Sequence, residues 1–172
     1  TNIDSDSRNI KENGLFVAIK GFDVDGHNYI KEAIKKGATA VLASIDIDKK
    51  LLKEIMNDVT IILAKDTRYA LAICACNFND NPSRKFKLVG ITGTKGKTTT
   101  SFMVKRILEK AGKKVGLVGT IATYIGDKKL EDSDRTTPES LELQQTFRQM
   151  VDEGVEVCVM EVSSQSLKLH RV

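Results

Sequence analysis

The sequence predicts an α/β fold built from two consecutive domains. Three observations lead to this prediction: short strand-like apolar segments alternate with helix-like ones, a polar break around Pro82 separates two halves, and the second half restarts with a strand that runs into a glycine-rich turn. The 172 residues are enough to bury a core in one ordinary domain or in two small ones.

In the first half, three apolar segments predict strands, and a helix is expected after each of them. The expected strands are residues 15–19, 40–43 and 59–64, and the expected helices are residues 29–36, 49–57 and 66–78. Gly37 ends the first helix, and the side chain of Asp66 can cap the third. This alternation indicates a small layered domain over residues 1–84, with residues 79–84 as the linker.

The second half also alternates between expected strands and expected helices. The expected strands are residues 87–92, 115–118 and 155–160, and the expected helices are residues 98–110 and 137–154. Residues 124–128 predict a hairpin turn. Thr137 followed by Pro138 is typical of a helix start, with threonine as the N-cap and proline at the first helical position. Glu161 then follows the last expected strand.

Charge and cysteine content narrow the classes of protein. Residues 1–84 hold twelve basic and twelve acidic side chains, whereas the second half carries the whole net charge of +4, so the two halves are expected to bind different ligands. No apolar run approaches the roughly 20 residues that span a bilayer, and the start is polar. Three cysteines are too few for a disulfide scaffold, so a reducing cytoplasm is expected. The chain does not begin with Met, which suggests a trimmed or processed N-terminus.

The strongest motif is GITGTKGKTT at residues 90–99. A strand, a glycine turn and a helix start come in the order that a phosphate-binding loop requires. Gly93 and Gly96 allow successive backbone N–H groups to point at one anion. Lys97 can reach terminal phosphates, and the hydroxyl of Thr98 can bind Mg²⁺. The common pattern has its first glycine where Ile91 stands, so this loop is a variant of that pattern.

Glu161 is the second candidate in this half. A carboxylate at the end of a buried strand downstream of such a loop is where nucleotide enzymes hold Mg²⁺. The alternative is a glutamate that caps the turn at Ser163 and Ser164, and position alone leaves both interpretations open.

Residues 93–99 resemble the ATP loop of the Mur ligases, the ATP-dependent enzymes that build the peptidoglycan peptide. Further segments resemble the members of that family that add the third residue, diaminopimelate or lysine. They are DSR at 6–8, GLFVA at 14–18, DGHNYI at 25–30, TTPE at 136–139, MEVSSQ at 160–165 and HRV at 170–172. These segments occur in the family's order along nearly the whole chain.

The resemblance implies a role for particular residues. The UDP part of the substrate is expected at Ser7, Phe22, Asp23 and Val24. ATP is expected at Gly93, Thr94, Lys95, Gly96, Lys97, Thr98 and Thr99, with Lys97 as the catalytic residue. The muramoyl-dipeptide is expected at Thr136, Thr137, Ser163 and Arg171, and Mg²⁺ at Thr98 and Glu161. Lys95 stands where the family usually has Asn, and Arg135 where some members have Asn.

The resemblance also implies an activity and a domain plan. ATP would convert the D-glutamate carboxylate of UDP-N-acetylmuramoyl-L-Ala-D-Glu to an acyl phosphate, which a diamino acid attacks. Residues 1–84 would be the UDP-substrate-binding domain and residues 85–172 the N-terminal part of the central ATP-binding domain. A C-terminal amino-acid-binding domain and a carbamylated lysine are expected beyond residue 172, so the fragment is not expected to complete catalysis alone. A monomeric enzyme of cell-wall synthesis, and thereby of cell shape and division, is expected.

Other classes of protein remain as alternatives. A folylpolyglutamate-type ligase or a kinase would share residues 93–99, although the block at 6–8 argues against the former and the neutral first half against the latter. A nucleic-acid-binding module would need aromatic side chains among basic ones, and the sequence has no Trp. Neither nucleic acid nor a membrane is therefore expected as a partner. The sequence does not distinguish diaminopimelate from lysine, nor whether His27 caps a helix or lines the UDP pocket.

Overall fold

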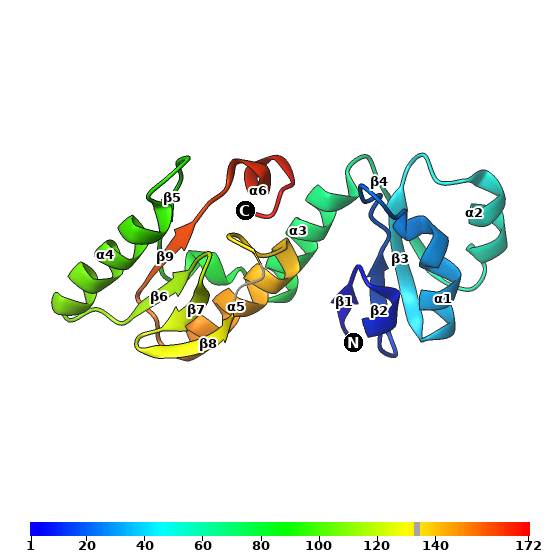
Figure 1. The fold of residues 1–172 in the computed structure, drawn as a ribbon. Helices are drawn as coiled ribbons and strands as arrows, with labels where there is room; N and C mark the ends of the chain where they lie inside the picture. Colours follow the sequence, from blue (N-terminus) through cyan, green and yellow to red (C-terminus); the bar gives the residue numbers. More distant parts are fainter. Residues whose placement is uncertain (133–134) are drawn as a thin grey trace. The chain divides into compact units, whose positions relative to one another are not determined.

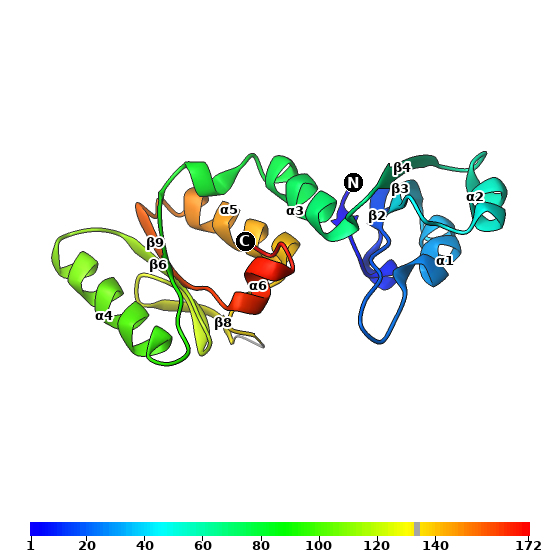
Figure 2. The ribbon, with the colours of Figure 1, turned by 90° about the horizontal axis from the view of Figure 1, so that it is seen from above.

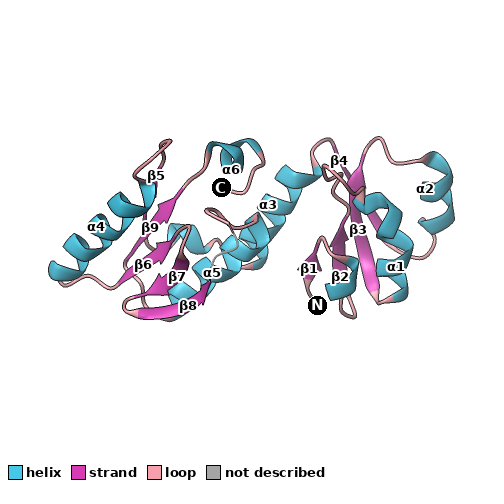
Figure 3. Ribbon diagram, viewed as in Figure 1, coloured by secondary structure: helices cyan, strands magenta, loops and turns pink. Residues whose placement is uncertain are grey.

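The computed structural model describes residues 1–132 and 135–172, which form two compact units, Thr1–Cys74 and Ala75–Val172 (Figures 1 and 3). The division falls within helix α3 (Thr67–Phe78). Each unit has its own sheet with helices packed on it, which confirms the α/β class. Within the described residues, no helix is long and apolar enough to cross a membrane.

The first unit contains a four-stranded parallel sheet in the order β1-β2-β3-β4. Its strands are β1 (Ile3–Asp4), β2 (Gly14–Val17), β3 (Ala38–Ser44) and β4 (Thr60–Ala64), and its helices are α1 (Ile30–Lys35), α2 (Lys49–Ile55) and the start of α3, with short 3₁₀ helices at Ser7–Asn9 and Gly26–Tyr29. Phe16 and Val41 of the sheet are fully buried against Ile30 of α1 and Ile55 of α2. All three strands and all three helices expected in this half are present.

Local signals account for the helix ends in this unit. The carboxylate of Asp66 accepts hydrogen bonds from the backbone N–H groups of Arg68 (2.9 Å) and Tyr69 (3.0 Å), so the expected cap is confirmed. Gly37 follows α1 with φ +108°, a conformation that side chains rarely adopt. Strand β1 was not expected, because two residues are too few to show a periodic pattern.

The second unit contains a five-stranded sheet in the order β5-β9-β6-β7-β8. The strands are β5 (Lys87–Ile91), β6 (Val115–Val118), β7 (Ala122–Ile125), β8 (Lys128–Asp132) and β9 (Val157–Glu161), and the helices are α4 (Lys97–Lys110), α5 (Ser140–Asp152) and α6 (Ser164–Lys168). Strands β5, β9 and β6 are parallel, while β7 and β8 form an antiparallel hairpin about the turn expected near residue 126.

Helices α4 and α5 cover opposite faces of this sheet (Figure 2). Leu117 and Val159 pack towards Phe102 of α4, whereas Cys158 and Met160 pack towards α5. This alternation follows from the two-residue period of a strand. Burial raises the pKa of the Cys158 thiol, so that side chain is an uncharged part of the core.

The expected helix start at Thr137 is wrong. Helix α5 begins at Ser140, and its N-cap position is Glu139, whose side chain makes no capping hydrogen bond. The hydroxyl of Thr137 instead donates to the backbone oxygen of Glu161 at 2.9 Å and accepts from the N–H of Ser163 at 3.2 Å. Threonine before proline matches a local capping pattern, but here a bond to a distant strand uses the hydroxyl.

Candidate functional site

The glycine-rich loop of the second unit joins β5 to α4. Gly93 and Gly96 have φ values of +148° and +78°, which only glycine adopts readily, and Gly96 stands at the N-cap of the helix. The side chains of Thr94 and Lys95 are exposed, while Lys97 is half-buried and its Nζ donates to the backbone oxygen of Gly93 at 2.8 Å. The backbone therefore turns sharply at the positive end of a 14-residue helix, with an ammonium group beside it.

Glu161 is fully buried at the carboxyl end of β9. Its Oε2 accepts from the hydroxyl of Thr98 at 3.0 Å and from that of Thr120 at 3.1 Å, and its Oε1 accepts from the N–H of Thr120 at 3.1 Å. All of these donors are neutral. The alternative, a cap for the next turn, is not what the carboxylate does, because Ser163 caps α6 with its own hydroxyl.

Strand order explains why these residues meet. Strand β9 is last in the chain but lies between β5 and β6, and all three run parallel. The segments that follow them therefore emerge at one edge of the sheet, the usual place for ligands in such folds. Thr98 and Glu161 are brought together in this way although they are 63 residues apart in the sequence.

Thr120 is a residue that the sequence analysis missed. It follows β6, its backbone and hydroxyl both hold Glu161, and its Oγ1 lies 3.1 Å from that of Thr136. It therefore connects the carboxylate to the segment before α5. The only signal in the sequence was a hydroxyl side chain just after a buried strand.

The four residues expected at the muramoyl-dipeptide also lie at this edge. Thr136 reaches Thr120, and Thr137 bonds both the backbone of Glu161 and that of Ser163. Arg171 approaches the backbone oxygen of Thr137 at 3.5 Å. Thr137 is buried, and its hydroxyl ties the segment before α5 to the end of β9.

Not all N–H donors of the Arg171 guanidinium are paired among the described residues. Its Nη2 forms an ion pair with Glu139 at 2.7 Å, and Arg135 pairs with the same carboxylate at 2.6 Å. The Nε of Arg171 is buried and has no hydrogen-bond partner among the described residues. Since an unpaired buried donor is costly, this guanidinium is suited to an additional acceptor.

In the first unit, the residues expected at UDP follow two neighbouring strands. Ser7 follows β1 and is buried in a short 3₁₀ helix, whereas Phe22, Asp23 and Val24 follow β2 at an exposed loop tip. Because β1 and β2 are parallel, both segments lie at the same edge of the sheet. An aromatic ring that is 81% exposed, as Phe22 is, suits stacking on a flat ligand.

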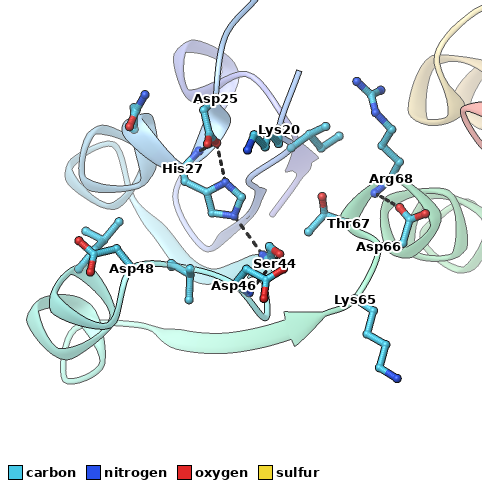
Figure 4. Close-up of a pocket in the computed structure, with 14 residues that line it drawn as sticks. Lys20, Asp25, His27, Ser44, Asp46, Asp48, Lys65, Asp66, Thr67 and Arg68 are labelled. Atoms are coloured by element: carbon cyan, nitrogen blue, oxygen red, sulfur yellow. Dashed lines mark hydrogen bonds and ion pairs between the residues drawn. The ribbon is translucent and has the colours of Figure 1, made fainter. Parts of the chain in front are cut away.

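A cavity of about 470 Å³ opens at the carboxyl ends of β2, β3 and β4 (Figure 4). Its lining includes Lys20, His27 and Arg68, and none of the four residues expected at UDP. In Figure 4 the imidazole of His27 lies between Asp25 and Ser44 and bonds both. The side chain of His27 caps no helix among the described residues and lines this cavity, while a UDP pocket at His27 stays a prediction.

A substitution at Gly119 would show how rigidly the side chain of Glu161 is held. A Cβ at residue 119 would overlap Oε1 of Glu161 and lie 3.2 Å from its Cδ. Because that carboxylate is buried and hydrogen-bonded, Gly119→Ala is expected to lower the free energy of unfolding by about 1–3 kcal/mol in denaturant titrations. Adding Glu161→Asp, which shortens the side chain, should recover part of the loss. An unchanged stability in Gly119→Ala would show that Glu161 moves freely.

Two family models match this chain. "Mur ligase family, catalytic domain" matches residues 1–79, and "Mur ligase middle domain" matches residues 91–172. The chain belongs to the Mur ligase family. The two models leave only residues 80–90 of this Mur ligase chain unmatched, and the second includes the glycine-rich loop from Ile91 onwards together with Glu161 and its hydrogen-bond partners.

Named relatives agree with the family models. UDP-N-acetylmuramoyl-L-alanyl-D-glutamate--2,6-diaminopimelate ligase of Clostridium perfringens is 55% identical over 171 residues, which is 99% of this chain and 34% of the relative. The corresponding protein of Clostridium botulinum is 56% identical over 170 residues, again 99% of this chain and 34% of the relative. The Mur ligase chain thus spans about a third of the length of the curated relatives it matches.

A solved structure of a ligase with the same name superposes with a TM-score of 0.81 at 19% identity, covering 99% of this chain and 33% of that one, and shows the same fold.

Proposed function

We propose that this chain is the part of an ATP-dependent ligase that binds the UDP-linked precursor and ATP. The reaction would join 2,6-diaminopimelate to the D-glutamate of UDP-N-acetylmuramoyl-L-alanyl-D-glutamate, as in the names of the relatives. The observation that carries the proposal is the arrangement around Glu161. Through Thr120, this carboxylate connects Thr98 of the phosphate loop to Thr136 of the expected dipeptide site.

The proposal keeps the two functional domains expected from the sequence. Residues 1–84 would bind the UDP part, and residues 85–172 would form the first part of the ATP-binding domain. In support, the two family models end at residue 79 and begin at residue 91, on either side of that boundary. The cytoplasm is the proposed location and a monomer the proposed state.

The phosphate loop is the proposed ATP site. The glycine conformations, the helix N-terminus and Lys97 all favour a bound polyphosphate. The MurF ligase of Thermotoga maritima, solved in complex with ADP, superposes with a TM-score of 0.59 at 26% identity and covers 95% of this chain and 32% of that one. This match supports binding of an adenine nucleotide by this chain.

Glu161 and Thr98 fit Mg²⁺. The ion prefers oxygen ligands and is usually held by one or two carboxylates together with substrate phosphates. Glu161 is a fully buried carboxylate with neutral donors around it, and no Lys or Arg pairs with it among the described residues. A buried charge without a counter-charge is costly, so a cation suits this position. When bound, Mg²⁺ would neutralise charge on the phosphates of ATP.

The chemistry follows from these positions. An oxygen of the D-glutamate carboxylate attacks the γ-phosphorus of ATP, ADP leaves, and an acyl phosphate forms. The amine of diaminopimelate attacks the acyl carbon, phosphate leaves with the bonding electrons, and the amine loses a proton as the amide forms. Lys97 and the loop N–H groups stabilise charge on the transferring phosphoryl group. Arg171 lies at the same edge, beside Thr137, and is placed to orient the dipeptide.

The test uses a protein of the relatives' full length that contains this sequence. Phosphate release from ATP is expected only when both the UDP-muramoyl-dipeptide and diaminopimelate are present, because the acyl phosphate needs a carboxylate and its breakdown needs an amine. The measurement is a continuous phosphate assay with each substrate omitted in turn. L-Lysine in place of diaminopimelate is the matched control and should give little turnover. Equal phosphate release without the dipeptide would exclude the ligase.

A further inference from the structure

The loop that follows β2 is closed at its base and exposed at its tip. Lys20 and Asp25 form an antiparallel bridge across the base, and the N–H of Gly21 donates to the backbone oxygen of Val24 at 2.8 Å. A Cβ at Gly21 would lie 2.7 Å from that same oxygen, so the turn is tight. At the tip, Phe22 is 81% exposed and Val24 55% exposed. The loop therefore presents apolar surface from a fixed base.

His27 connects the base of this loop to the sheet. The backbone N–H of Ser44 donates to its Nε2 at 3.0 Å, so Nε2 carries a lone pair and the ring proton is on Nδ1, 2.6 Å from Asp25. The backbone N–H of His27 also donates to Asp25 at 3.0 Å; this bond and the imidazole lower the pKa of Asp25. The side chain of His27 is only 13% exposed.

The position of Ser44 explains why an imidazole is needed. Strand β2 ends at Val17, which is paired with Leu42, so Ser44 lies two residues beyond the last paired position of β3 on that side. Its N–H faces the side where β2 has ended, and the imidazole supplies the acceptor in place of a strand carbonyl. Because β3 lies between β2 and β4, this bond fixes the loop to an interior strand.

We propose that His27 is a positioning residue, which holds the loop carrying Phe22, Asp23 and Val24 in its binding conformation by accepting the N–H of Ser44 and donating to Asp25. The inference rests on the proposed function, in which that loop holds the uridine diphosphate part of the substrate. His27 itself does not contact the ligand in this scheme. Its contribution is to reduce the cost of ordering the loop when the ligand binds.

Three variants separate the two contacts of the imidazole. His27→Ala removes both, His27→Asn retains a donor near Asp25 but does not reach Ser44, and His27→Gln places an amide oxygen where Nε2 accepts. The 172-residue chain is titrated with UDP by calorimetry, and separately with a non-hydrolysable ATP analogue. Asn57→Ala, at an exposed residue that does not line the cavity, is the matched control.

We expect His27→Ala and His27→Asn to weaken UDP binding about tenfold, the equivalent of one hydrogen bond. His27→Gln and Asn57→Ala should stay within about threefold of the parent, and binding of the ATP analogue should be unchanged throughout. Should His27→Ala fail to fold in thermal unfolding, the comparison of the Asn and Gln variants decides. Two results would overturn the role of His27 while leaving the UDP site in place. One is an equal UDP affinity in all variants, and the other is UDP binding by His27→Gln as weak as that by His27→Asn. A parent chain that binds the ATP analogue but not UDP would overturn the UDP site as well.

Discussion

Replacing Lys97 by alanine in a protein of the relatives' full length is expected to lower the rate of product formation by about 100- to 1000-fold. The ammonium group of Lys97 lies at the start of α4, beside the carbonyl of Gly93, where the γ-phosphate of ATP would be held. Its charge is needed when negative charge moves onto the transferring phosphoryl oxygens. The variant should fold, because the side chain of Lys97 makes one loop hydrogen bond within residues 1–132 and 135–172 and is only half-buried. The measurement is the initial rate of amide formation.

Lys110→Ala is the matched control for this experiment. Lys110 is an exposed lysine at the opposite end of the same helix, so its loss changes the net charge equally without touching the loop. We expect near-normal rates from it. Retained turnover in Lys97→Ala would mean that the phosphate loop has been assigned wrongly.

Glu161→Gln is expected to remove Mg²⁺-dependent nucleotide binding while leaving the fold intact. The amide oxygen of glutamine can still accept from the N–H of Thr120, and its NH₂ can donate to the hydroxyls of Thr98 and Thr120, which can reorient. The negative charge is lost, and with it the ligand for a cation. Calorimetric titration with ATP, with and without Mg²⁺, should show that the metal no longer increases affinity, and amide formation should fall by at least about 100-fold.

Glu156→Gln controls for the loss of a carboxylate near the same strand. Glu156 directly precedes β9, is about half-exposed and pairs with Lys113 on the surface. Surface ion pairs contribute little, so both nucleotide binding and melting temperature should be unchanged. If Glu161→Gln still showed the full Mg²⁺ effect on ATP affinity, the proposed metal ligand would be wrong.

Much of the fold could be predicted because its signals are local. Strand and helix periodicity, the cap at Asp66 and the helix end at Gly37 depend on only a few neighbouring residues. The prediction was wrong at Thr137, where a local capping pattern competed with a hydrogen bond to Glu161. Strand β1 was missed because its strand character comes from pairing with β2.

The candidate site was predicted where it is contiguous in the sequence. The phosphate loop is one segment, so its glycines, Lys97 and Thr98 could be read together. The role of Thr120 and the bond between Ser44 and His27 could not, since each depends on a partner far along the chain, 41 residues away for Thr120 and Glu161 and 17 for Ser44 and His27.

The sequence by itself determined the order of strands and helices, the glycine-rich loop and the candidate residues. Only the tertiary structure decided which of them meet. Because β9 lies between β5 and β6, Glu161 at its end is held by Thr98 from one side and by Thr120 from the other. Strand order depends on packing over the whole sheet rather than on neighbouring residues, and for that reason no local pattern in the sequence contained it.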